Sequence, residues 1–114
     1  MSMPTPPLSK ARRLGDALHL SGELGFLADG SLPEGIAAQT EATIDRIEAT
    51  LKAEGLDLSD VVAATCYLTD KADFAAFNAV YAARFPQPYP TRTTIECGLM
   101  IDAKVEITVV AKVR

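Results

Sequence analysis

Apolar and polar residues alternate most clearly near the C-terminus. Residues 105–111 read VEITVVA, which puts Val105, Ile107, Val109 and Ala111 on one side and Glu106, Thr108 and Val110 on the other. A period of two residues predicts a β-strand with one face on a core. Glu106 is therefore expected to project from the face opposite the core.

A second alternating stretch, residues 90–97, precedes this strand. Ile95 and Cys97 are assigned to its apolar side, and the other side carries Arg92, Thr94 and Glu96. With this phase, Arg92 and Glu106 both project from the less apolar face of a sheet. Such a face meets water, a partner subunit or a ligand, and which of these it meets decides the function.

The N-terminal part predicts an arm followed by a hairpin. Residues 1–7, MSMPTPP, have no apolar periodicity and are expected to form an arm that is fixed only if something packs on it. Residues 11–14 and 17–21 flank Gly15-Asp16, a pair typical of a hairpin turn. His19 falls opposite its leucine neighbours, so we interpret it as a structural or surface residue.

The next pattern is helical. Apolar or small residues recur at spacings of four, four, three and four, at Ile36, Thr40, Ile44, Ile47 and Leu51. This spacing predicts an amphipathic helix. Residues 31–34, SLPE, are a plausible capping box at its start, and Gly55 is a natural left-handed cap at its end.

The middle of the chain predicts a strand and a second helix. Residues 61–68, VVAATCYL, have few polar side chains, which indicates a central strand covered on both faces. Asp70 can cap a helix that Pro86 ends. Aromatic side chains recur at helical spacing, and we interpret them as core residues rather than a stacking platform: Phe74, Phe77, Tyr81 and Phe85.

The order ββαβαββ predicts an α+β fold in which two helices cover one face of a single sheet. At 114 residues the chain is a single domain spanning residues 1–114. The uncovered face, expected to carry Thr94 and Val110, is neither polar enough for solvent nor closed by the chain. Self-association into a homo-oligomer is the economical explanation.

Composition narrows the functional classes. The net charge of −4 has no basic stripe, which argues against nucleic-acid binding. No apolar run is long enough for a membrane span, and residues 1–7 lack signal-peptide features, so a cytoplasmic protein is expected. Cys66 and Cys97 are interpreted as buried free thiols, and a lone histidine, His19, makes a zinc site improbable. No glycine-rich phosphate loop is present.

Arg92 and Glu106 leave two interpretations open. They can form a surface salt bridge, worth at most about 1 kcal/mol. Alternatively, Arg92 offers its bidentate fork to a ligand carboxylate while Glu106 orients or deprotonates a water molecule. Ser21 lacks the histidine and acid of a nucleophilic triad, but its hydroxyl group can hydrogen-bond a ligand.

A set of short motifs runs along nearly the whole chain. They are Pro7-Leu8-Ser9-Lys10-Ala11, Gly15-Asp16, Leu20-Ser21-Gly22, Ala38-Gln39-Thr40, Gly55, Leu58-Ser59-Asp60-Val61-Val62, Leu68-Thr69-Asp70, Asp73-Phe74, Asn78, Tyr81, Pro90-Thr91-Arg92-Thr93 and Val105-Glu106-Ile107. Each motif is weak alone, but their order and spacing make the chain resemble the Rid (YjgF/YER/UK) family of reactive-intermediate deaminases.

This resemblance implies a chorismate-mutase-like fold assembled as a homotrimer, with sheets inside, helices outside and clefts between neighbouring subunits. It implies hydrolysis of 2-aminoacrylate-type enamines and imines to 2-oxo acids and ammonia, like that of a 2-iminobutanoate/2-iminopropanoate deaminase. The substrate would be a small carboxylate, and no metal or organic cofactor is expected.

The resemblance also assigns roles by position. Arg92 matches the arginine that binds the substrate carboxylate, and Glu106 matches the glutamate that activates water. Thr94 occupies the position whose backbone meets the ligand, and Ser21 and Gly22 match the pair that lines the cleft. The chain departs from the family pattern in three places, at Leu8 where a tyrosine is usual, in a short Pro86–Pro90 segment, and at Leu99-Met100 where Leu-Pro is common.

Two other functions stay open. A non-catalytic trimer of the same fold would bind a small carboxylate or regulate another enzyme, and Leu8 favours this alternative slightly. A ribonuclease is the third candidate, but the acidic net charge and the lack of a histidine pair argue against it.

Overall fold

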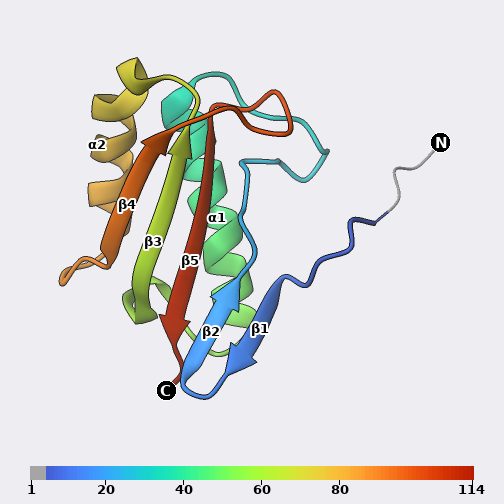
Figure 1. The fold of residues 1–114 in the computed structure, drawn as a ribbon, viewed down its shortest axis with the longest axis vertical. Helices are drawn as coiled ribbons and strands as arrows, with labels where there is room; N and C mark the ends of the chain where they lie inside the picture. The colour runs from blue at the N-terminus through green and yellow to red at the C-terminus, as the bar shows by residue number, and fades with distance from the viewer. Residues whose placement is uncertain (1–4) are drawn as a thin grey trace.

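The computed structural model describes residues 5–114, which form a five-stranded sheet with two α-helices on the same face (Figure 1). The elements are β1 (Ala11–Leu14), β2 (Ala17–Leu20), α1 (Ile36–Ala53), β3 (Val61–Leu68), α2 (Phe74–Arg84), β4 (Thr91–Glu96) and β5 (Val105–Lys112), with short 3-10 helices η1 (Leu58–Asp60) and η2 (Lys71–Asp73). The predicted order of elements and the α+β class are confirmed.

The sheet has the strand order β1-β2-β5-β3-β4. Strands β3 and β4 pair in parallel, and the other neighbours are antiparallel. The central strand is therefore β5, and the prediction that residues 61–68 form the central strand is wrong by one place. The same stretch was expected to be covered on both faces, but only one of its faces is covered within the chain, since Thr65 and Tyr67 are only half-buried on the other.

The core lies between the sheet and the two helices. The predicted α1 stripe is confirmed, because Ile44, Ile47 and Leu51 are fully buried and Thr40 is buried with them. They pack with alternate residues of β5, of which Val105 and Ile107 are fully buried. Burying one such aliphatic side chain contributes roughly 1.5–3 kcal/mol, so this layer fixes which face of β5 is turned inward.

The two ends of α1 differ from each other in how well the sequence predicts them. The capping box at residues 31–34 is wrong, because the cap residue is Gly35 at φ 87°, with no side-chain cap. Ser31 instead turns back, and its backbone N–H and hydroxyl donate to Asp29 Oδ1 at 2.9 and 2.6 Å. At the other end Gly55 has φ 76°, which confirms the left-handed cap.

The segment before β1 is exposed, and the cap before α2 departs in detail from the sequence-based expectation. Residues 5–7 are exposed, and the chain before β1 runs away from the sheet (Figure 1); the rest of the predicted arm, residues 1–4, lies outside the described residues. Asp70 accepts from the backbone N–H of Ala72 at 2.8 Å, so it caps η2, which leads directly into α2.

No helix in residues 5–114 is long and apolar enough to cross a membrane.

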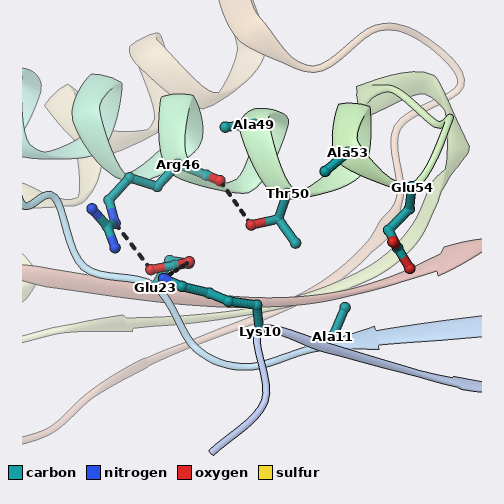
Figure 2. Close-up of a pocket in the computed structure, with 8 residues that line it drawn as sticks. All are labelled: Lys10, Ala11, Glu23, Arg46, Ala49, Thr50, Ala53 and Glu54. Carbon is teal, nitrogen blue, oxygen red and sulfur yellow. Dashed lines mark hydrogen bonds and ion pairs between the residues drawn. The ribbon is translucent and has the colours of Figure 1, made fainter. Parts of the chain in front are cut away.

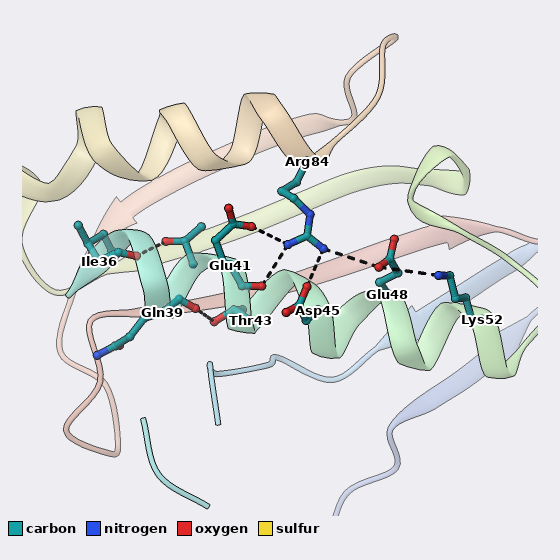
Figure 3. A network of polar contacts seen from close by, with 9 residues as sticks. Ile36, Gln39, Glu41, Thr43, Asp45, Glu48, Lys52 and Arg84 are labelled. Atoms are coloured by element: carbon teal, nitrogen blue, oxygen red, sulfur yellow. Dashed lines mark hydrogen bonds and ion pairs between the residues drawn. The ribbon is translucent and has the colours of Figure 1, made fainter. Parts of the chain in front are cut away.

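An ion-pair network joins the two helices on their outer side (Figure 3). Arg84 at the end of α2 lies 2.7 Å from Glu41, 2.8 Å from Asp45 and 3.7 Å from Glu48, all on α1. Hydrogen bonds from Arg84 to Glu41 and Asp45 outweigh its partial burial and raise the pKa of its guanidinium group. A single cation thus offsets the repulsion among carboxylates that are neighbours on one helix face.

We expect Arg84→Met to lower the free energy of unfolding by about 1–2 kcal/mol, since the network is partly exposed to solvent. Lys52→Met is the matched control, because Lys52 contacts Glu48 at 3.9 Å and is largely exposed. This control should change stability by less than about 0.5 kcal/mol. Urea unfolding measures both, and equal losses would show that Arg84 does not hold the helices together.

Candidate functional site

Arg92 lies on the edge strand β4 and projects from the helix-covered face of the sheet. It pairs in register with the buried Ala64 of β3. Its Cζ atom lies 4.8 Å from the ring centroid of Tyr81, 5.5 Å from that of Phe77 and 5.7 Å from that of Phe74. Within residues 5–114, no carboxylate lies within ion-pair distance of Arg92. Aromatic faces therefore hold the guanidinium group and leave its N–H donors for another anion.

The aromatic residues of α2 have a second role that sequence reasoning did not assign. Phe77, Tyr81 and Phe85 are buried, as predicted, whereas Phe74 is 43% exposed and is not a core residue. The interpretation of these rings as core alone is incomplete, because three of them stack on or beside Arg92. Helix α2 thus sets the position of a side chain on the sheet edge.

The interior beneath Arg92 is polar but unreactive. Thr94, which follows Arg92 on the same face, has a buried hydroxyl without a hydrogen-bond partner in residues 5–114, as does Tyr81. Burial raises the pKa of the Cys66 thiol to about 12, so Cys66 stays a protonated core residue. Cys97 is also a free thiol, but it is only half-buried and lies just beyond β4, so the expectation that it is buried is wrong. No cluster of three potential metal ligands occurs in the described part of the chain.

Glu106 lies on the opposite face of the sheet, the face without helices. It pairs in register with Tyr67 of β3 and is half-buried. Gly22 packs so closely against it that a Cβ atom there would lie 2.2 Å from Glu106 Oε2. Burial first, and then the negative charge of Glu23, raise the pKa of Glu106. A carboxyl group in this environment is suited to accept and release protons closer to neutral pH.

The prediction that Arg92 and Glu106 share one face is wrong. The register of β3 with β4 places Arg92, Thr94 and Glu96 on the helix side, and Ile95 lies on the open face with 45% exposure. Thr94 therefore does not belong to the open face, whereas Val110 does, since it pairs with His19. The two residues also make no salt bridge with each other, because the sheet separates them.

Ser21 and Gly22 lie on the Glu106 side. The Ser21 hydroxyl donates to the Ser9 carbonyl oxygen at 2.6 Å, which ties the segment before β1 to the end of β2. Ser21, His19 and Leu8 line an open cavity of about 510 Å³ on this face. Leu8 is 55% exposed, so the position where a family tyrosine was expected presents an apolar surface beside the predicted site.

Sequence reasoning missed a buried acid next to Gly22. Glu23 is 7% exposed and pairs with Lys10 Nζ and Arg46 Nε, each at 3.1 Å. These charges form the floor of an open cavity of about 490 Å³ beside α1 (Figure 2). The cations lie 13 and 23 residues from Glu23 in the sequence, so no local spacing pointed to this cluster.

Together these features define a single-sheet α+β fold. Its edge strand offers an arginine that has no carboxylate partner among residues 5–114, and its open face offers a partly desolvated glutamate. The sequence matches the family model described as endoribonuclease L-PSP over residues 2–113. The chain therefore belongs to that family, which is the YjgF/RidA family.

Two of the similar proteins carry deaminase names. The chain is 38% identical over 108 residues to the chloroplastic Reactive Intermediate Deaminase A of Arabidopsis thaliana, covering 92% of this chain but only 58% of the plant protein. It is 34% identical to the 2-iminobutanoate/2-iminopropanoate deaminase of Escherichia coli K12, covering 86% and 80% of the two chains. The crystal structure of RidA from the Antarctic bacterium Psychrobacter sp. superposes with a TM-score of 0.92 at 34% identity, covering 97% and 92%.

The raised pKa of Glu106 predicts a pH-dependent change in stability. A folded-state pKa above the ordinary value of 4.5 means that the folded protein binds more protons than the unfolded chain, so the free energy of unfolding falls as pH rises through this window. Glu106→Gln should thus be more stable than wild type at neutral pH, and the difference should shrink as pH falls through the folded-state pKa and be smallest below pH 4.5. Urea unfolding across this pH range measures it, and a difference that is constant with pH would contradict the assignment.

Proposed function

We propose that this protein hydrolyses short-lived enamines and imines of small 2-amino acids, of the 2-aminoacrylate type, to 2-oxo acids and ammonia. The reaction would occur in clefts between copies of the chain, in a homotrimer, with Arg92 from one copy and Glu106 from its neighbour. The single observation that carries this proposal is the placement of the two side chains on opposite faces of one sheet. The names of the deaminase relatives support the reaction class.

Two features support a cleft between copies. A small ligand in one chain cannot touch both Arg92 and Glu106, because Arg92 is on the helix side of β4 and Glu106 is on the open side of β5, two strands away. The open face carries partly exposed apolar residues, and β4 is an edge strand with one unpaired side. If β4 of one copy lies against the open face of another, both surfaces are covered and the two side chains meet.

The chemistry asks little of the protein. Arg92 would bind the substrate carboxylate through two charge-assisted hydrogen bonds. Glu106 would take a proton from water as the water oxygen attacks the electrophilic iminium carbon. Glu106 would then return that proton to the nitrogen of the carbinolamine. As the carbon–nitrogen bond breaks, the carbinolamine hydroxyl gives its proton to Glu106, ammonia leaves and the 2-oxo acid remains. Glu106 then passes that proton to the departing ammonia, which leaves as ammonium, and is a carboxylate again. Positioning and general-base assistance of this kind contribute roughly 10² to 10⁴-fold.

Arg92→Ala should lower kcat/KM about 10- to 150-fold, because a lost charge-assisted anchor is worth on the order of 1.5–3 kcal/mol. The kcat/KM of Arg92→Lys should lie between those of wild type and Arg92→Ala, and its KM should be raised, because a lysine keeps the charge but not the bidentate fork. Arg13→Ala is the control, because it also removes an arginine but one outside the proposed site. Arg13 Nε donates to the Gly15 carbonyl in the β1–β2 turn. The measurement is a coupled assay that generates 2-iminopropanoate, and unchanged turnover by Arg92→Ala would contradict the proposal.

Mixing two variants of low activity tests whether the site is shared between copies. Arg92→Ala and Glu106→Gln, denatured together in equal amounts and refolded, should regain activity. Random assembly gives a complete pair in about a quarter of the clefts, because each cleft takes one residue from each neighbour. The variants refolded separately are the control. No recovery in the mixture would mean that each copy acts alone, and carboxylate binding without turnover in wild type would favour a non-catalytic carboxylate-binding protein instead.

A further inference from the structure

Two consecutive residues connect Glu106 to an ion-pair cluster formed by Glu23, Lys10 and Arg46. Gly22 packs against the Glu106 carboxylate, and Glu23 follows at once. Glu23 is anchored to β5 because its N–H donates to the Ile107 carbonyl at 2.9 Å and its C=O accepts from the Ile107 N–H at 3.0 Å. Glu23 is thus held beside the residue that follows Glu106.

The Glu23 carboxylate is buried and paired from two other segments (Figure 2). Lys10 Nζ, just before β1, contacts Oε2 at 3.1 Å, and Arg46 Nε, on α1, contacts Oε1 at 3.1 Å. Arg46 also donates to the Phe26 carbonyl at 3.4 Å, so it is fixed on both sides. Lys10 has a side chain that is 58% exposed, whereas that of Glu23 is 9% exposed.

We propose that Lys10, Glu23 and Arg46 form an electrostatic cluster that adjusts the proton affinity of Glu106, beyond the effect of its burial, and thereby shifts the pH range of the reaction. Glu23 acts as a positioning residue, because it does not line the face that carries Glu106. This inference rests on the proposed function only where it concerns the reaction; the effect on Glu106 itself is independent of it.

The sign of each contribution follows from charge. The Glu23 carboxylate opposes ionisation of Glu106, which agrees with the raised pKa of Glu106. Lys10 and Arg46 are cations that pair with Glu23, so each of them favours the ionised form of Glu106 and weakens that opposition. Removing the negative charge of Glu23 should therefore lower the pKa of Glu106, and removing the positive charge of Lys10 or Arg46 should raise it.

Other charged or titratable groups lie on or beside the open face. They are Tyr67 on β3, His19 on β2, Arg12 on β1, Lys112 on β5 and Lys104 just before β5. All five stay unchanged in the variants below, so a difference between those variants reports on the cluster alone.

The test is a ¹³C NMR titration of the Glu106 carboxyl group in the full-length protein. Glu23→Gln should lower the pKa of Glu106, because a negative charge is removed. Lys10→Met should raise it, because Glu23 loses a compensating cation. Lys10→Arg should restore the wild-type titration, and Lys52→Met, remote on α1, should leave it unchanged. Lys10 is exposed, so its variants should fold even if Glu23→Gln does not.

Opposite shifts from Glu23→Gln and Lys10→Met support the inference, and a purely structural role for the cluster would not produce them. Shifts in the same direction, or no shift from Lys10→Met, overturn it. The acidic limb of the pH–rate profile should shift in each variant in the same direction as the measured pKa of Glu106. If the titration moves and the acid limb does not, the cluster is confirmed while the role of Glu106 as the base is wrong.

Discussion

Arg92 rests on aromatic rings and not on a carboxylate. A cation–π contact at an exposed site is worth about 0.5–1 kcal/mol, which is comparable to a surface salt bridge. The two contacts differ in whether they use the N–H donors of the arginine. A ring face attracts the cation, but it accepts no hydrogen bonds from the N–H groups that lie in the plane of the guanidinium group. With Tyr81 at 4.8 Å and no carboxylate of residues 5–114 at ion-pair distance, Arg92 can bind an anion without first breaking an ion pair.

The sheet imposes the second constraint. Successive side chains on a strand point to opposite faces, so Arg92 and Glu106 cannot be brought together by a local adjustment of either strand. The open face of the sheet is also the face that residues 5–114 leave uncovered, and Glu106 is only half-buried there. One event, the covering of this face by a neighbouring copy, would both remove exposed apolar surface and complete the proposed site.

The sequence predicted the elements where several core residues agreed in phase. In β5 and α1 a run of apolar side chains fixed the inward face, and the structure agrees. In β4 only Ile95 among six residues is strongly apolar, and it lies on the open face, so the phase was inverted. The capping box failed because Asp29 takes the Ser31 side chain, and the Glu23 cluster was missed because its partners are distant in sequence.

The environment of Glu106 matches what the proposed reaction requires. Burial raises its pKa in a single copy, and a second copy that covers the open face would desolvate it further. The same copy would bring the positive charge of Arg92 toward it, which favours the ionised form. The two effects oppose each other, and so assembly need not trap Glu106 in either state. A carboxyl group balanced in this way can accept a proton from water and release it to a leaving amine within one turnover, and its fine adjustment then falls to fixed charges such as Glu23 and Lys10.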